Sequence, residues 1–143
     1  MTAESTGTGT GTASRERVVA TATLVLGVVQ VGLGLWMALA PRSFFDSIGG
    51  FGSYNDHYLR DVSTFYLALG IGLIVASRRP SRRVPVLGVA LLQYAFHVVN
   101  HVVDVGDADP SWAGPFDVMS LAAGAAAFAL LLAVARSRNG RRT

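Results

Sequence analysis

The sequence predicts an all-α protein, an antiparallel bundle of four transmembrane helices with a disordered N-terminal tail. Four nearly continuous apolar stretches predict the helices. Of the 143 residues, 51% are hydrophobic, which is more apolar surface than one soluble domain of this size can bury. The third observation is the distribution of arginine. Ten of the twelve arginines lie in the two terminal segments and the middle connection, which a bundle of four antiparallel spans brings to one end.

The four predicted spans cover residues 18–40, 56–77, 84–104 and 116–135. A helix needs about 20 apolar residues to cross roughly 30 Å of hydrocarbon, and the first, third and fourth stretches meet this directly. The second stretch is shorter. Its helix is therefore expected to begin near Asn55, an N-cap residue, and to carry Arg60 and Asp61 into the boundary layer of the membrane.

The distribution of arginine also predicts the orientation of the chain. Arg15 and Arg17 precede the first span, four arginines separate the second from the third, and four follow the last. The other two connections hold only Arg42 and Arg60, together with most of the aspartates. By the positive-inside rule, both termini face the cytoplasm and the protein is a multi-pass protein of the cell membrane. Arginines in such blocks contact anionic lipid, so nucleic-acid binding is not expected.

The segments outside the spans have simpler interpretations. Residues 1–14 are mostly Thr, Gly, Ser and Ala, lack the apolar area that offsets the entropy of ordering, and are predicted to form a disordered cytoplasmic tail. Residues 15–136 then form the transmembrane domain, and residues 137–143 form a basic cytoplasmic tail. The connection of residues 41–54 is expected to be a loop folded back onto the membrane surface. The chain has no cysteine, which excludes disulfides and thiolate metal sites.

The third span carries a polar stripe in the half that lies near the aspartate-rich connections. Its members fall within an arc of about 100° on a helical projection. Ionisable groups inside a membrane face the bundle interior or a wet cavity and are candidates for function. The second span brings another polar set to the same end, and the fourth span adds Asp117. The stripe comprises Gln93, His97, Asn100, His101 and Asp104, and the second set includes His57, Arg60 and Asp61.

Three interpretations of these residues are open. In the first, they form a structural network that ties the helices together, with neutral histidines and with Arg60 paired to Asp61, Asp104 or Asp117 inside the bundle. Buried ion pairs often serve only to satisfy one another. An unpaired guanidinium at that depth would cost several kcal/mol, which is why a carboxylate partner for Arg60 is expected.

In the second interpretation, the cluster binds a divalent transition metal or relays protons. His97 and His101 are one helical turn apart and Asp104 follows after another turn, so that a helix can present two imidazoles and a carboxylate on one face. Zinc, iron or copper fits a site that lacks thiolates. Further ligands would come from His57, Asp61 or Asp117.

In the third interpretation, the protein is an enzyme that acts on a lipophilic substrate from the outer leaflet. An aspartate or histidine would supply acid–base chemistry, and Arg60 would stabilise developing negative charge. No nucleophile motif or cofactor-binding loop accompanies these residues. The partners expected in this interpretation are the lipid bilayer and a lipophilic small molecule. The candidate catalytic residues are His97, His101, Asp104, Asp61 and Arg60.

Three segments also resemble a known group of proteins. Residues 54–61 (YNDHYLRD), 97–104 (HVVNHVVD) and 114–117 (GPFD) are similar to segments of small four-helix membrane proteins of actinobacteria. In architecture the chain also resembles DoxX-type four-helix proteins. The resemblance covers residues 18–135 and implies a bacterial protein, membrane residence and an α-helical bundle. It carries over no catalytic residues.

Overall fold

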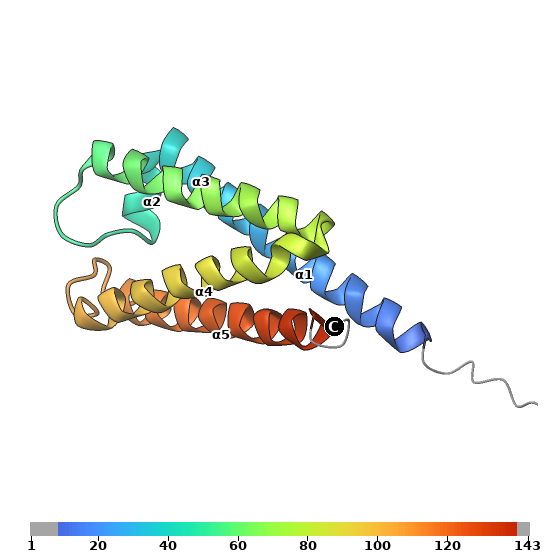
Figure 1. The fold of residues 1–143 in the computed structure, drawn as a ribbon. Coiled ribbons are helices and arrows are strands. Elements are labelled where there is room, and N and C mark those ends of the chain that lie inside the picture. The colour runs from blue at the N-terminus through green and yellow to red at the C-terminus, as the bar shows by residue number, and fades with distance from the viewer. Residues whose placement is uncertain (1–8, 140–143) are drawn as a thin grey trace, which may run out of the picture.

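The structure is a computed structural model that describes residues 9–139. Within them, α1 lies along α3 and α4 lies along α5, and the turn between α3 and α4 joins the two pairs (Figure 1). A short helix, α2, follows α1. The predicted all-α bundle of four long helices is confirmed. The helices are α1 (Gly9–Leu39), α2 (Pro41–Ser47), α3 (Asp56–Arg78), α4 (Pro80–Val103) and α5 (Ala113–Asn139).

The observed helices are longer than the predicted spans at several ends. Helix α3 begins where expected, because the side chain of Asn55 accepts a hydrogen bond from the backbone N–H of Tyr58 at 3.1 Å. Helix α4 begins four residues early, since Pro80 is well suited to the first helical turn. Helix α2 replaces part of the loop that was expected over residues 41–54.

Both predicted tails are partly helical. Helix α1 begins at Gly9, inside the tail predicted over residues 1–14, and α5 ends at Asn139, inside the tail predicted over residues 137–143. A helix that is nucleated in an apolar span gains one backbone hydrogen bond for each residue added, which favours extension past the span. The remaining tail residues, 1–8 and 140–143, lie outside the described part of the chain.

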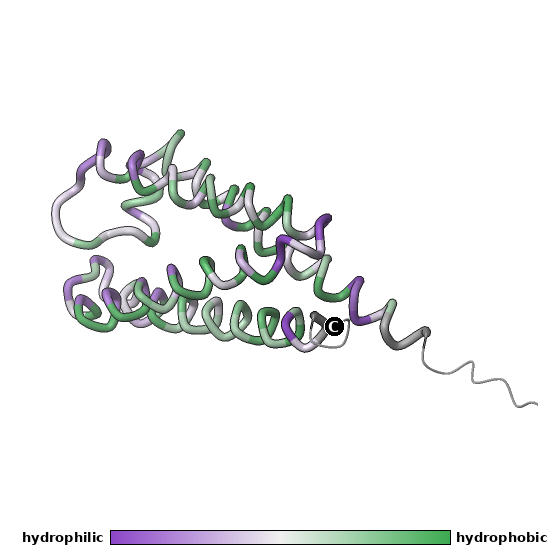
Figure 2. Tube along the Cα trace, in the orientation of Figure 1, coloured by the Kyte–Doolittle hydropathy of each residue, from purple (hydrophilic) through white to green (hydrophobic). Residues whose placement is uncertain are grey.

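Within residues 9–139, four helices are long and apolar enough to cross a membrane, over Ala13–Leu39, Asp56–Arg78, Pro80–Val103 and Ala113–Ser137. Figure 2 shows hydrophobic residues along the helix shafts and hydrophilic residues gathered near the ends. Large apolar side chains such as Leu35, Ile71 and Leu92 are exposed on the outer faces of the bundle. Such a surface is compatible with a small multi-pass membrane protein, because lipid covers what a soluble domain would bury.

The bundle has two chemically different ends. At the Arg-rich end lie the N-terminal part of α1, the α3–α4 turn and the C-terminal part of α5. At the Asp-rich end lie α2, the connection of residues 48–55 and the connection of residues 104–112. The start of α1 and the end of α5 are thus at the same end, as an even number of spans requires.

Three glycines allow α1 and α3 to approach closely. A Cβ atom on Gly70 would meet the backbone nitrogen of Val31 at 2.8 Å and the backbone oxygen of Gly27 at 2.9 Å. A Cβ on Gly34 would meet the side chain of Leu67 at 2.9 Å. Close approach at small residues is the usual way in which helices associate in lipid.

A buried arginine closes the Arg-rich end. The side chain of Arg83 donates to the carbonyl oxygens of Ala76 at 3.1 Å and Ser77 at 2.7 Å, in the last turn of α3. It also pairs with Glu16 of α1 at 2.5 Å, and only 6% of its side chain is exposed. This one guanidinium therefore satisfies carbonyls at the end of α3 and connects α4 with α1.

Candidate functional site

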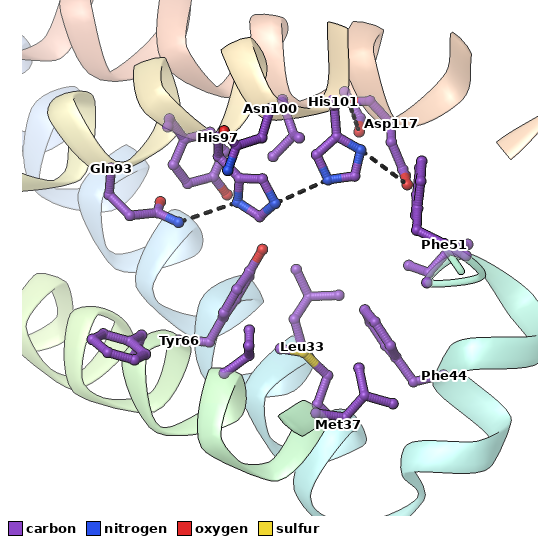
Figure 3. Close-up of a pocket in the computed structure, with 18 of the residues that line it drawn as sticks. Leu33, Met37, Phe44, Phe51, Tyr66, Gln93, His97, Asn100, His101 and Asp117 are labelled. Atoms are coloured by element: carbon purple, nitrogen blue, oxygen red, sulfur yellow. Dashed lines mark hydrogen bonds and ion pairs between the residues drawn. The ribbon is translucent and has the colours of Figure 1, made fainter. Parts of the chain in front are cut away.

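The half of the bundle near the Asp-rich end contains a cavity of about 820 Å³. All four long helices contribute to its wall, and α2 and the connection of residues 48–55 cover it from the Asp-rich end. Most of the lining is apolar, including Leu33 and Met37 of α1, Val62 of α3 and Leu121 of α5. Figure 3 shows the polar side chains of α4 on one wall and apolar side chains facing them. A largely apolar cavity with a few convergent polar groups is typical of a small-molecule site.

The polar wall is a continuous row of side chains. The amide nitrogen of Gln93 lies 3.3 Å from Nδ1 of His97, and Nε2 of His97 lies 3.0 Å from Nε2 of His101. Nδ1 of His101 then faces Oδ2 of Asp117 at 3.8 Å (Figure 3). We call these four residues the polar row. Its three α4 residues are spaced about one helical turn apart, and Asp117 lies near the start of α5.

One assignment of the imidazole protons satisfies every hydrogen bond of the polar row. The amide of Gln93 donates to Nδ1 of His97, so the proton of that neutral imidazole is on Nε2. His97 donates it to Nε2 of His101, which leaves the proton of His101 on Nδ1, directed toward Asp117. Two neutral histidines satisfy the whole chain of bonds. The remaining donor and the carboxylate meet at one point of the cavity wall.

Two atoms of the polar row are buried without a hydrogen-bond partner among the described residues. They are Oε1 of Gln93 and Nδ1 of His101. The distance of 3.8 Å from His101 to Asp117 is too long for a hydrogen bond. Because an unsatisfied buried donor or acceptor costs about 1–3 kcal/mol, this wall is poised to accept a polar group from another molecule.

Two aromatic residues that the sequence analysis did not select complete the site. Phe51 packs edge-on against His101 with 4.7 Å between ring centroids, and an antiparallel bridge to Ala108 holds it in place. Tyr66 of α3 points across the cavity toward His97, with 6.4 Å between centroids (Figure 3). The signal for Tyr66 was its spacing of two helical turns from the buried Leu59, which places both on one face of α3. No local pattern marked Phe51.

The charged residues of α3 lie outside the cavity. His57 is 85% exposed and pairs with Asp61 at 3.5 Å, one turn along the helix. Arg60 pairs with Asp56 at 3.1 Å, and both side chains are about half exposed. The expectation that Arg60 pairs inside the bundle with Asp61, Asp104 or Asp117 was therefore wrong. The face of α3 that carries Arg60 is turned outward, so its partner comes from the same helix.

The metal-binding interpretation gains no support from the geometry. Among the described residues, no group of three or more His, Asp or Glu side chains is placed to hold a metal ion. Asp104 lines the cavity, but the carboxylate that faces His101 belongs to Asp117 and lies at Nδ1, whereas Nε2 is bonded to His97. The two imidazoles thus share a hydrogen bond through the nitrogens that a shared metal would require.

The chain was compared with family models, curated proteins and solved structures. No family model, no curated protein and no solved structure matches it. The fold and the site define the class directly: a small α-helical protein whose described residues form four helices of membrane-crossing length and a largely apolar cavity between two helix pairs.

Proposed function

We propose that this protein binds a lipophilic alcohol in the cavity at the Asp-rich end. The observation that carries the proposal is the gap of 3.8 Å between Nδ1 of His101 and Oδ2 of Asp117 on the wall of an otherwise apolar cavity. A hydroxyl group seated there accepts a hydrogen bond from His101 and donates one to Asp117. A hydroxyl group carries the donor and the acceptor on a single oxygen atom.

The same gap distinguishes a hydroxyl from its chemical relatives. A carboxylate would bring a second negative charge to Asp117, and an alkane would leave both His101 and Asp117 unpaired. Sites built around buried polar atoms reject ligands that leave those atoms unsatisfied. The volume of about 820 Å³ lies within the range of pockets that enclose a small molecule.

The geometry supports binding more than a purely structural network. The polar row connects α4 only with its own partner α5 and therefore does not tie the two helix pairs together. Arg60, which was expected to complete such a network, pairs outside it. Among the described residues, Oε1 of Gln93 and Nδ1 of His101 are unpartnered on the cavity wall, where a bound ligand would satisfy them.

Equilibrium binding of tritiated 1-dodecanol to the detergent-purified protein tests the proposal. We expect saturable binding of one molecule per chain, competition by unlabelled dodecanol, and little competition by dodecane or dodecanoate. His101→Leu should weaken binding about tenfold or more, because it removes a donor next to a charged group. His57→Leu is the matched control and should bind as the wild type does, since His57 is exposed outside the cavity. Non-saturable binding, or equal affinities for all variants, would refute the proposal.

We infer further that the Arg-rich end faces the cytoplasm of a bacterial cell, as the positive-inside rule predicts. The chain contains no native cysteine to interfere with labelling. An impermeant thiol reagent applied to intact cells should label Asp109→Cys in the connection after α4 and spare Ser81→Cys near the α3–α4 turn. The reverse pattern would invert the orientation.

A further inference from the structure

We propose that the cavity opens sideways into the hydrocarbon of the bilayer, between α3 and α4. This opening would be the path by which the lipophilic alcohol enters, so its role rests on the function proposed above. The opening is nevertheless a property of the cavity wall, and it can be tested without any ligand.

The side chains at this edge contact both the cavity and the surroundings of the protein. Phe65 of α3 and Phe96 of α4 line the cavity, yet they are 72% and 69% exposed. Tyr58, two turns closer to the start of α3, also lines the cavity and is exposed. A residue that is exposed and also lines a cavity lies on its rim. The α3–α4 edge therefore has an aromatic rim.

Helical geometry places both phenylalanines on the side where no third helix covers them. Phe65 lies about 140° around α3 from Gly70, which contacts α1. Phe96 lies about 160° around α4 from Tyr94, which packs on Phe128 of α5. Each phenylalanine is thus turned away from the partner of its own helix and toward the edge that α3 and α4 share.

The rim lies at the depth of the lipid chains. Phe65 follows the first residue of α3 by nine positions, and Phe96 precedes the last residue of α4 by seven. At the rise of an α-helix these separations correspond to about 13 Å and about 10 Å along spans that cross roughly 30 Å of hydrocarbon. An opening there meets acyl chains and not water.

Within residues 9–139, the side-chain hydrogen bonds between helices leave this edge unlinked toward the Asp-rich end. Across the bundle, the hydroxyl of Tyr94 donates to Oε1 of Gln30 at 3.3 Å and so connects α4 with α1. In the described residues, the side-chain hydrogen bonds between α3 and α4 are both made by Arg83, at the turn. Toward the Asp-rich end, the described residues make no side-chain hydrogen bond between α3 and α4, so the side chains at this edge can rotate aside.

Tryptophan fluorescence in vesicles of dibrominated phosphatidylcholine tests the opening. In a Trp36→Phe, Trp112→Phe background, Tyr66→Trp places the only tryptophan on the inner wall of the cavity. We expect brominated chains to quench it nearly as strongly as a tryptophan in Phe65→Trp, which faces lipid. Phe128→Trp, at a fully buried core position, is the control and should be quenched several-fold less.

Quenching of Tyr66→Trp at the low level of Phe128→Trp would overturn the proposal, because the cavity would then be closed to lipid. Val62→Trp, also on the cavity wall, repeats the measurement if Tyr66→Trp does not fold. If Tyr66→Trp is quenched but dodecanol does not bind, the proposed ligand is wrong and the proposed opening stands. Absence of quenching with dodecanol still bound would remove the route and keep the site.

A second measurement identifies the edge that opens. Phe96→Cys and Val29→Cys each introduce a unique thiol at a residue that is exposed and lines the cavity, the first beside α3 and the second on α1, whose Val29 is 50% exposed. Modification with a bulky maleimide should reduce the lipid quenching of Tyr66→Trp several-fold at Phe96→Cys and leave it unchanged at Val29→Cys. Protection by the label at Val29→Cys alone would place the opening between α1 and α5 and overturn the proposal.

Discussion

The two halves of the bundle treat buried polar groups in opposite ways. At the Arg-rich end, Arg83 is buried and bonded to Ala76, Ser77 and Glu16, which come from two neighbouring helices. In the other half, Gln93 and His101 each keep a buried atom without a partner at the wall of a cavity. Saturated polar groups hold helices together, whereas unsaturated ones are available to a ligand.

Chain connectivity explains why the halves differ. The connection of residues 40–55 links α1 to α3 and the connection of residues 104–112 links α4 to α5, so both stay within a helix pair. The two pairs are joined covalently only at the α3–α4 turn, where one residue, Arg79, separates the helices. At the Asp-rich end they meet through weaker contacts, such as the hydrogen bond of 2.8 Å from Asp109 to Gly50. The pairs can therefore diverge around a cavity at that end.

The largest expected effect on stability is at the Arg-rich end, where the buried polar groups are hydrogen-bonded. Arg83→Ala should lower the free energy of unfolding by about 3 kcal/mol or more, because it leaves buried carbonyl groups of α3 without their donor and removes the ion pair that connects α4 with α1. Arg82→Ala, an exposed neighbour, is the matched control and should change little. Thermal or denaturant unfolding in detergent measures both. If the two variants unfold alike, the Arg-rich end is not closed by Arg83.

A smaller loss is expected where α1 and α3 approach. Gly70→Ala should destabilise the protein by about 1–3 kcal/mol, since the new Cβ would press on backbone atoms of α1 that cannot rotate away. At Gly72 the nearest atom to a new Cβ is 3.8 Å away, which is ordinary contact. Gly72→Ala should therefore be neutral or stabilise by up to about 1 kcal/mol through helix propensity. The difference between these two unfolding free energies is the measurement.

In the hollow half, a larger side chain should stabilise and not disrupt. Val62→Phe adds apolar volume to the cavity wall and is expected to raise the unfolding free energy by about 1 kcal/mol, while weakening dodecanol binding. Ile71→Phe, on the lipid-facing side of the same helix, should alter neither quantity. A destabilised Val62→Phe variant would mean that this half is already filled, contrary to the comparison between the halves.

The smallest effect on stability is expected for two exposed ion pairs on the surface of the protein. Arg60→Ala and Arg42→Ala each break an exposed pair with a carboxylate one turn away on the same helix, Asp56 and Asp46 respectively. Solvent screens such pairs, so both variants should melt within the scatter of the wild type. A clearly lower melting temperature for Arg60→Ala alone would indicate that Arg60 pairs with a carboxylate inside the bundle, as the sequence had suggested.

The sequence by itself determined the four spans, the Arg-rich end and the polar stripe of α4. Backbone groups in lipid must be satisfied within each helix, so a long apolar stretch has one structural solution that depends on local residues alone. The alignment of Gln93, His97 and His101 followed likewise from the period of a single helix.

Only the tertiary structure decided which groups meet. It placed Asp117 opposite Nδ1 of His101, turned Arg60 outward, and used Gly70 and not Gly72 to contact α1. These outcomes depend on the rotation of each helix about its axis and on the divergence of the two pairs. Both are set by packing between segments far apart in the chain, which helical periodicity does not encode.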